Sequence, residues 1–373
     1  MKILVAGDFA PQNRVNFQIE RNDYSCLENV ERIISLADYS IVNFESPILM
    51  HKSPPIVKTG PNLWCSEKAM ACIAQVGFNC VTLANNHFRD FGQRGVEDTL
   101  IACRKYNIDY VGGGIDIVEA TKILYKDING QRLAIINVCE NEWSIADKKR
   151  GGAAPLNPIQ VFYLIQSAKK NDSIVLVIIH GGIELYQYPT PHMQEVYRFF
   201  INVGADAVVN HHQHCFSGYE IYKGKPIFYG LGNFCFDNNN LKSILWTQGY
   251  MVTLQFENGN VHYELIPYNQ CTDIAKVICL NELEREEFYD TIIRINDVIS
   301  DNSCLQSRFD MRVKIDGARL FDVFEPIRNK YVKKLRSKKL LPSLIFSHKR
   351  NLIYNVIRCE SHREVLLRFL ENE

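Results

Sequence analysis

Short apolar segments rich in Val and Ile alternate with segments of helical periodicity over residues 1–210, and this alternation constrains the fold more than any other feature. Buried parallel strands are continuous runs of branched apolar residues, whereas the helices that cover them carry one apolar stripe. The pattern therefore predicts an α/β fold. The expected strands are 3–6, 40–44, 80–83, 108–111, 133–138, 174–179 and 207–209, and the expected helices are about 27–37, 66–76, 92–105, 158–170 and 191–203.

The pattern changes after residue 219. Closely spaced strands are expected at 219–222, 226–229, 250–256 and 261–267, with Lys-Gly-Lys and Glu-Asn-Gly-Asn as turn signals between them. We interpret them as a second, antiparallel set of strands. From about residue 280 the chain becomes charged and helical, so we expect a main domain over 1–280 and a helical, basic C-terminal extension over 281–373.

The charges balance over the whole chain but not within the extension. The 42 Lys and Arg residues equal the 42 Asp and Glu residues, so we expect no nucleic-acid partner. Residues 328–350 carry nine Lys or Arg and no Asp or Glu, around the apolar stretch 340–346. A basic and apolar segment of this kind suits peripheral contact with an anionic membrane surface. A solvated face and a role in oligomerisation are the alternatives.

No signal for membrane spanning or secretion is evident. No apolar run reaches the roughly 18 residues that a spanning helix needs, and the acidic residue at position 8 interrupts the apolar start of the chain. We therefore expect a cytoplasmic protein, in peripheral contact with the inner membrane face if residues 328–350 bind lipid.

Polar residues gather where the expected strands end, which is where ligands of open α/β sheets bind. The candidates are Asp8, Glu45, Asn86, His87, His180 and the stretch from His211 to His214. Imidazole and carboxylate together suit Mn, Fe or Zn. A site for two such ions needs about seven or eight donors with one carboxylate shared between them.

Each motif alone has a structural interpretation as well. Gly7-Asp8 is common in turns, Glu45 before Ser-Pro can cap or bend the chain, and a lone His180 can be a hydrogen-bonded core residue. The stretch His-His-Gln-His differs, since three imidazoles in four residues have little packing value. In an extended segment His212 and His214 would point to the same side. This favours a metal site.

The motifs in their order resemble the CapA family of capsule and poly-γ-glutamate synthesis proteins, over roughly residues 1–240. The resemblance rests on Gly7-Asp8, Asn43-Phe-Glu-Ser-Pro47, Lys58-x-Gly-Pro61, Gly77-Phe-Asn-Cys-Val-Thr-Leu-Ala-Asn-Asn-His87 with Asp90, His180-Gly-Gly-Ile-Glu184, His211-His-Gln-His214 and Gly224-Lys-Pro-Ile-Phe-Tyr-Gly-Leu-Gly-Asn-Phe234.

That family is similar to the calcineurin-like metallophosphoesterases, which implies a four-layer αββα sandwich and a site for two divalent ions (Mn, Fe or Zn). The resemblance implies Glu45 as the bridging carboxylate, and the metal ligands that it implies are Asp8, Glu45, Asn86, His180, His212 and His214. The chain departs from the superfamily pattern at Ala10, where a His is usual. Water or another residue such as His211 would then complete that metal position.

The remaining candidate residues concern catalysis and substrate. His87 is the expected proton donor to the leaving group, and Asp90 would orient it. Lys58, Arg89 and His211 are the expected substrate-binding residues, with Arg94 also near these motifs; Arg can bind anions through a bidentate fork.

Three functions follow from the resemblance. The first is a metal-dependent hydrolase of a phosphate ester or phosphodiester, acting on a small-molecule or polymer substrate in capsule or surface-polymer biosynthesis. The second is a hydrolase of an amide or another polymer linkage, because a bridging hydroxide can also attack a carbonyl. The third is a non-catalytic capsule-assembly or polymer-binding factor, which Ala10 favours.

Overall fold

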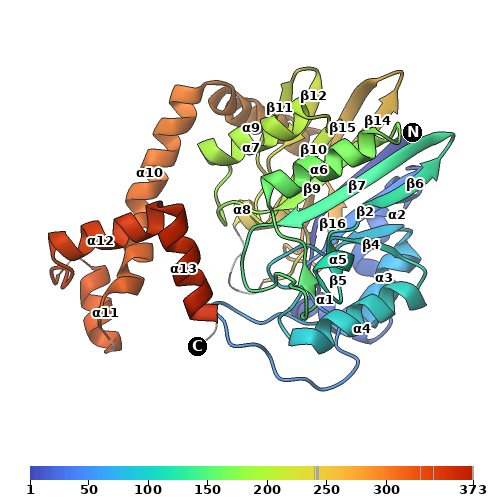
Figure 1. The fold of residues 1–373 in the computed structure, drawn as a ribbon. Coiled ribbons are helices and arrows are strands. Elements are labelled where there is room, and N and C mark those ends of the chain that lie inside the picture. The colour runs from blue at the N-terminus through green and yellow to red at the C-terminus, as the bar shows by residue number, and fades with distance from the viewer. Residues whose placement is uncertain (239, 241–242, 328, 339, 372–373) are drawn as a thin grey trace. The chain divides into compact units, whose positions relative to one another are not determined.

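The computed structural model describes residues 1–238, 240, 243–327, 329–338 and 340–371. It divides into two compact units, Met1–Gln306 and Ser307–Glu373. All strands of the described residues lie in the first unit, whereas the second consists of helices and their connections (Figure 1).

The larger sheet of the first unit has eight strands among the described residues, in the order β16-β15-β14-β1-β2-β3-β4, with β13 paired to the end of β1. Strands β1 to β4 are parallel, and β14 runs antiparallel to β1. Their bounds are β1 Lys2–Phe9, β2 Tyr39–Phe44, β3 Cys80–Thr82, β4 Asp109–Val111, β13 Asn233–Cys235, β14 Gln248–Glu257, β15 Asn260–Gln270 and β16 Val277–Cys279.

The second sheet has six strands among the described residues, in the order β11-β12-β10-β9-β7-β6. The central strands β12, β10, β9 and β7 are parallel. The bounds are β6 Leu124–Ile128, β7 Gln131–Cys139, β9 Ile174–His180, β10 Ala207–His211, β11 Tyr219–Tyr222 and β12 Lys225–Phe228. A small two-stranded sheet joins β5 (Gly113–Gly114) and β8 (Gly152–Ala153).

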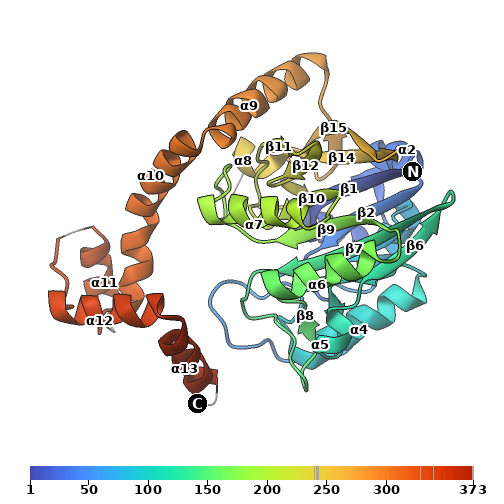
Figure 2. The same cartoon turned by 45° about the horizontal axis from the view of Figure 1, so that its top comes forward.

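Helices cover both sheets, so that the unit is a four-layer αββα sandwich (Figures 1 and 2). Helices α6 and α7 pack on the six-stranded sheet, α2 and α4 contact β16 and β4 of the eight-stranded sheet, and α3 packs against α1 and α2. The helices of this unit are α1 Asn13–Glu20, η1 Ser25–Leu27, α2 Glu28–Ser35, α3 Lys68–Val76, α4 Gly92–Lys105, α5 Ile117–Ala120, α6 Pro158–Lys169, α7 Pro191–Asn202, α8 Ile244–Thr247 and α9 Glu282–Ser300.

The burial of the sheet strands explains the runs of Val and Ile in the sequence. In β9 the residues from Val175 to Ile179 are fully buried, as expected of a strand covered on both faces. Each such Val, Ile or Leu side chain contributes about 1.5–3 kcal/mol when it leaves water. The expected α/β fold, strands and helices are confirmed, with helix ends differing by one or two residues.

The grouping of the later strands differs from the prediction. Strands at 219–267 do not form one separate antiparallel set. The β11–β12 hairpin extends the six-stranded sheet, where β12 pairs parallel to β10, while the β14–β15 hairpin extends the other sheet beside β1. Turn signals fix a hairpin locally, but they carry no information about which sheet the hairpin joins.

Helix α9 belongs to the first unit. Asn281 and Glu284 form a capping box at its start, and its side chains Phe288, Ile292 and Ile295 are buried in the main core. The first compact unit therefore continues to Gln306, beyond the predicted domain boundary at 280.

The second unit contains the helices α10 (Asn302–Phe321, which begins in the first unit), η2 (Asp322–Phe324), α11 (Lys330–Ser337), α12 (Ser347–Arg358) and α13 (Glu360–Glu371). Arg328 and Lys339 of the predicted basic segment lie outside the described residues. None of the helices in the described part of the chain combines the length and apolar character that crossing a membrane requires.

Candidate metal centre

Strands from both sheets bring polar side chains to one place. Asp8 lies next to the last residue of β1, Glu45 directly follows β2, His180 ends β9 and His212 directly follows β10. All four side chains are buried, with at most 5% of their surface exposed. Carboxylates and imidazoles taken out of water together need opposite charges, hydrogen bonds or a metal ion.

The first ligand set consists of Asp8, Glu45 and His214, whose ligand atoms all lie within 4.8 Å of one another. His214 Nδ1 lies 3.6 Å from Asp8 Oδ2, and His214 Nε2 lies 3.7 Å from Glu45 Oε1. Two carboxylates and one imidazole are donors that Mn, Fe and Zn accept.

The second ligand set contains Glu45, His180 and His212 at the same spacing. His180 Nε2 lies 3.0 Å from His212 Nδ1 and 3.5 Å from Glu45 Oε1. The amide oxygen of Asn86 joins them, since its Oδ1 lies 3.0 Å from His180 Nε2. The second set therefore has four protein donors, and the first has three.

Glu45 belongs to both sets and is the best indicator of what the centre holds. Among the described residues, neither of its buried carboxylate oxygens has a hydrogen-bond partner. Burial, followed by the charge of Asp8, raises the pKa of Glu45 well above its ordinary value. Two cations on either side of this carboxylate would satisfy both oxygens. The residues thus fit a pair of divalent ions with Glu45 shared between them.

The histidines of the two sets differ in charge. Burial alone would lower the pKa of His214, but the charge of Glu45 and the hydrogen bond and charge of Asp8 raise it to about 10. Burial and the charge of His214 lower the pKa of His212 to about 4. Burial and the neighbouring imidazoles also lower the pKa of His180. The second set therefore offers neutral imidazoles, which are ready to bind a metal, whereas the first set must release a proton.

Two buried amides orient the ligands, and sequence reasoning gave neither of them a role. The Asn43 side chain donates to Asp8 Oδ1 at 2.7 Å and lies 3.2 Å from His180 Nδ1. Asn233 Oδ1 lies 2.9 Å from His214 Nδ1, which leaves His214 Nε2 facing Glu45. Such outer contacts fix the ring orientation of metal ligands. An Asn within a buried Val and Ile strand was the signal that could have found Asn43.

The backbone after β10 differs from the expected extended segment. β10 ends at His211, and His212 and His214 have φ values of 91° and 55°. The expectation that both imidazoles share one side through strand alternation was wrong. The left-handed backbone turns each imidazole toward a different ligand set. Non-glycine residues in this region cost about 1–3 kcal/mol and are typical of functional sites.

Ala10 occupies the position at which the superfamily pattern usually has a His. It is fully buried in a small apolar cluster with Leu63, Phe236 and Trp246. An apolar surrounding offers no donor there. His211 lies nearby, with its Nδ1 3.5 Å from Asp8 Oδ1, but it is in neither of the ligand sets of the described residues.

The expected acid group is assembled as a buried triad. His87 Nδ1 lies 2.7 Å from Asp90 Oδ2. The Lys58 ammonium forms an ion pair with Asp90 and lies 3.2 Å from His87 Nδ1. Burial lowers the pKa of His87, Asp90 raises it, and the charge of Lys58 lowers it further. Lys58, expected to bind substrate, is 3% exposed and engages the triad.

Ser144 supports the turn that carries Asn86 and His87. Its hydroxyl donates to the Asn86 carbonyl at 2.7 Å and accepts from the Arg89 amide at 3.1 Å. The Arg89 guanidinium is half-buried, and burial followed by the charge of Arg150 lowers its pKa. Its electrostatic neighbours are therefore on the 147–150 loop rather than among the ligand carboxylates. Arg94 lies on α4, with its Nη1 4.0 Å from Asp98 Oδ1.

Glu142 faces the second ligand set from the loop after β7, a position that sequence reasoning did not identify. Its Oε1 lies 3.9 Å from His212 Nε2, on the side of the ring opposite His180. Burial and the charge of Glu184 raise the pKa of Glu142. Carboxylates behind a metal-bound imidazole strengthen it as a ligand.

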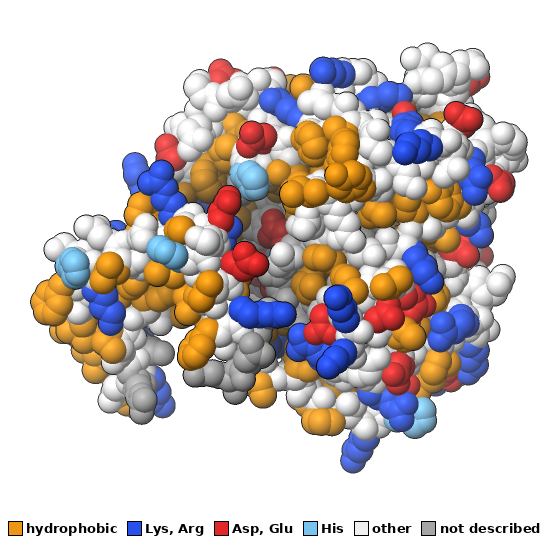
Figure 3. All heavy atoms as spheres, in the orientation of Figure 1, with side chains coloured by type: hydrophobic (Ala, Val, Ile, Leu, Met, Phe, Trp, Pro, Cys, Tyr) orange, Lys and Arg blue, Asp and Glu red, His pale blue; other side chains and the backbone are white. Residues whose placement is uncertain are grey.

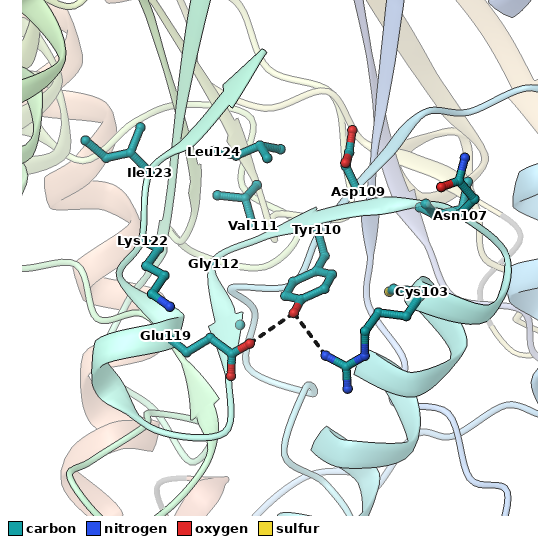
Figure 4. Close-up of a pocket in the computed structure, with 13 residues that line it drawn as sticks. Cys103, Asn107, Asp109, Tyr110, Val111, Gly112, Glu119, Lys122, Ile123 and Leu124 are labelled. Atoms are coloured by element: carbon teal, nitrogen blue, oxygen red, sulfur yellow. Dashed lines mark hydrogen bonds between the residues drawn. The ribbon is translucent and has the colours of Figure 1, made fainter. Parts of the chain in front are cut away.

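A separate cavity of about 480 Å³ lies beside β4, α4 and α5 (Figure 4). Three of its polar groups are hydrogen-bonded to one another, since Arg104 donates to the Tyr110 hydroxyl at 3.3 Å and that hydroxyl donates to Glu119 Oε1 at 3.0 Å. None of the described ligand residues lines it.

Comparison with known proteins gives a family match over most of the first unit. The family described as "Bacterial capsule synthesis protein PGA_cap" matches residues 2–238. This range includes both ligand sets and the His87 triad.

Three relatives are similar to the chain. The "Capsule biosynthesis protein CapA" of Bacillus anthracis is 30% identical over 283 residues, 72% of this chain and 67% of the relative. The "PGA biosynthesis protein CapA" of Bacillus subtilis is 32% identical over 250 residues, 65% of this chain and 64% of the relative. A "Probable polyglutamine synthesis accessory protein" of Mycobacterium tuberculosis is 29% identical over 164 residues, 40% of this chain and 43% of the relative. The chain thus spans about two thirds of the length of the two Bacillus relatives.

Proposed function

The chain belongs to the bacterial capsule synthesis protein family PGA_cap, and from this we propose that it is a metal-dependent hydrolase of a phosphate ester or phosphodiester in capsule or surface-polymer biosynthesis. The observation that carries the proposal is the buried carboxylate of Glu45, which is shared by two ligand sets and lacks a hydrogen-bond partner among the described residues.

Divalent Mn, Fe or Zn would supply Lewis acidity and an activated water at this centre. Asp8, Glu45 and His214 would hold one ion, and Glu45 together with Asn86, His180 and His212 would hold the other. Asn43 and Asn233 keep the ligands in place, so little reorganisation accompanies the reaction.

His87 donates the proton that the leaving oxygen needs. Its Nδ1 is held by Asp90, so its Nε2 is the nitrogen left to face the substrate. The charge of Lys58 lowers the pKa of His87, which makes protonated His87 a stronger acid and also reduces the fraction of His87 that carries the proton at neutral pH. Asn86 and His87 are neighbours in the chain, which places the acid beside the metal ligands.

A substrate panel with Mn²⁺ tests the proposal. We expect hydrolysis of p-nitrophenyl phosphate or bis-p-nitrophenyl phosphate, and a loss of about 100-fold or more in His87→Ala, since general acid catalysis contributes about 10²–10⁴-fold. His192→Ala is the matched control, because His192 is an exposed histidine on α7. Equal rates in wild type and a His212→Ala, His214→Ala variant would contradict metal-dependent hydrolysis.

Hydrolysis of an amide linkage is the second candidate. It is favoured by the name of the mycobacterial relative, which refers to a polymer joined by amide bonds. The same panel separates the two when it includes γ-glutamyl-p-nitroanilide. Turnover of this substrate alone, lost in the His212→Ala, His214→Ala variant, would replace the phosphoesterase proposal.

A non-catalytic assembly role is favoured by a different observation, the apolar surroundings of Ala10. If Asn86→Ala, His87→Ala protein supports polymer production in cells as well as wild type, this role takes precedence over both hydrolase candidates.

A further inference from the structure

A loop of apolar side chains is exposed in the second unit between α11 and α12. Leu340, Leu344 and Phe346 are exposed by 65%, 54% and 80%, and Leu341 by 37%. We call residues 340–346 the apolar loop. Single exposed apolar residues are ordinary on protein surfaces, but a cluster of four in seven residues marks a surface that binds something.

The loop is fixed in this conformation by its other residues. Ile345 is buried, and Glu325, only 7% exposed, accepts a hydrogen bond from the Leu344 amide at 3.0 Å and another from the Ser343 hydroxyl. Arg336 Nη2 lies 2.8 Å from the same Glu325 carboxylate. A buried ion pair and one apolar anchor thus hold the backbone while the leucines and Phe346 point outward. The loop presents its apolar side chains without having to fold first.

Basic residues flank the apolar loop on both sides in the sequence. Lys330, Lys338, Lys349 and Arg350 are exposed, and residues 328–350 contain no acidic side chain. The imbalance extends over the unit, since residues 307–373 carry 16 Lys and Arg against 8 Asp and Glu, whereas residues 1–306 carry 26 against 34. The positive charge is therefore concentrated where the apolar side chains are exposed.

Helix α13 adds further exposed apolar side chains to the same unit. Val365, Leu367, Phe369 and Leu370 are exposed by 71%, 54%, 56% and 58%. Figure 3 shows hydrophobic side chains next to Lys and Arg on the visible face of this unit, at the left of the picture. Basic residues beside Leu and Phe on short amphipathic helices are typical of segments that lie in a membrane interface.

We propose that the second unit binds an anionic lipid bilayer, with the side chains of the apolar loop inserted among the acyl chains and the flanking Lys and Arg at the headgroups. A soluble polyanion would pair with the basic residues but leave the leucines and Phe346 in water. A second copy of the chain would meet its own basic charge at the same surface. A bilayer with anionic headgroups accommodates both properties at once.

Vesicle co-sedimentation of the full-length chain tests the proposal. We expect binding to phosphatidylcholine vesicles that contain 30% phosphatidylglycerol, and at least about tenfold weaker binding to phosphatidylcholine alone. Replacing both Lys338 and Lys349 by Ala should weaken the anionic binding by about 25-fold, because each basic residue contributes about fivefold. Leu344→Ser, Phe346→Ser should weaken it by about tenfold or more at unchanged charge.

The matched control is Ile159→Ser, Tyr163→Ser on α6, which removes two side chains exposed by 71% and 66% from the first unit. It should bind vesicles as wild type does. Circular dichroism of each variant checks that the helices are retained, as expected when exposed residues are replaced.

Three results would overturn the proposal. One is equal vesicle binding by wild type and Leu344→Ser, Phe346→Ser, which would mean that charge alone attracts the chain to the vesicle and that the apolar loop does not insert. Another is binding of soluble polyglutamate but of neither vesicle. The third is a change of oligomeric state in Leu344→Ser, Phe346→Ser without vesicle binding by wild type, which would assign the loop to a second copy.

Discussion

The two ligand sets share Glu45 but are built differently. The second set has four donors, neutral imidazoles and the carboxylate of Glu142 behind His212. The first set has three donors, a protonated His214 and the apolar surroundings of Ala10. One buried carboxylate is thus common to two ligand sets that differ in the number and charge of their donors. We therefore expect the two ions to bind with different affinities, the second set first.

Replacing the shared carboxylate should have the largest effect. In Glu45→Gln both sets lose the charged donor that they share. We expect both ions to bind at least about 100-fold more weakly, because mutation of a residue that only contacts a metal ligand already lowers metal affinity by about 10–100-fold. Metal content after purification without chelator measures this. Glu264→Gln, at an exposed position on β15, is the control. Two retained ions in Glu45→Gln would show that the sets do not depend on it.

Removing one histidine from the first set or from the second set should affect metal binding differently. His214→Ala leaves the first set with two donors, so we expect that ion to be lost and the other kept. His180→Ala leaves three donors in the second set, the same number as in the first, so we expect the affinity difference between the two sites to shrink. Calorimetric titration with Mn²⁺ resolves the sites. Loss of both ions in each variant would mean that the two positions bind as one unit.

The stability of the folded chain should depend on pH in opposite ways through His214 and His212. The raised pKa of His214, about 10 against an ordinary 6.5, means that its proton stabilises the folded chain fully below about pH 6.5 and that this contribution is lost as the pH rises through 10. The lowered pKa of His212, about 4, has the opposite sign, so the folded chain gains stability as the pH rises from 4 to 6.5.

Filling the first set at pH 8, after the second set is occupied, should release about one proton, because His214 is protonated. The pKa of Glu45 is raised as well, so any proton that Glu45 carries leaves with the ion that binds first and is not counted in this step. Titrations in two buffers of different ionisation enthalpy give the proton count for each step. Binding of the later ion without proton release would contradict the charge assigned to His214.

The smallest effect is expected at position 10. Ala10→His and Ala10→Val should each destabilise the metal-free chain by about 1–3 kcal/mol, because both overpack a fully buried position. Added Mn²⁺ should restore more of the thermal stability in Ala10→His, where the imidazole can act as a fourth donor. An equal response in both variants would show that a side chain at this position does not reach the first ion.

The residues that sequence reasoning found lie at the ends of apolar strands or within a few residues after them. Asp8, Glu45, Asn86, His180, His212 and His214 are readable because a polar residue at the end of a Val and Ile run stands out. The sandwich then brings these strand ends together, which the α/β pattern already implied.

The residues that it missed act across pairings distant in sequence. Asn233 reaches His214 because β13 pairs beside β1, with Asn233 opposite Asp8. Glu142 depends on the course of a loop. Lys58 was found as a candidate, but its contact with Asp90 depends on the burial of its ammonium group. Local periodicity in the sequence carries no information about such long-range strand pairing, loop courses or side-chain contacts. The same reason explains why the strands at 219–267 could be located but not assigned to a sheet.

Electron paramagnetic resonance of the chain loaded with two equivalents of Mn²⁺ tests whether two ions share Glu45, because only ions that share a ligand couple through it. We expect an exchange-coupled dimanganese spectrum in wild type that is absent in Glu45→Gln. A spectrum of isolated Mn²⁺ ions only, identical in both proteins, would contradict a centre built around Glu45.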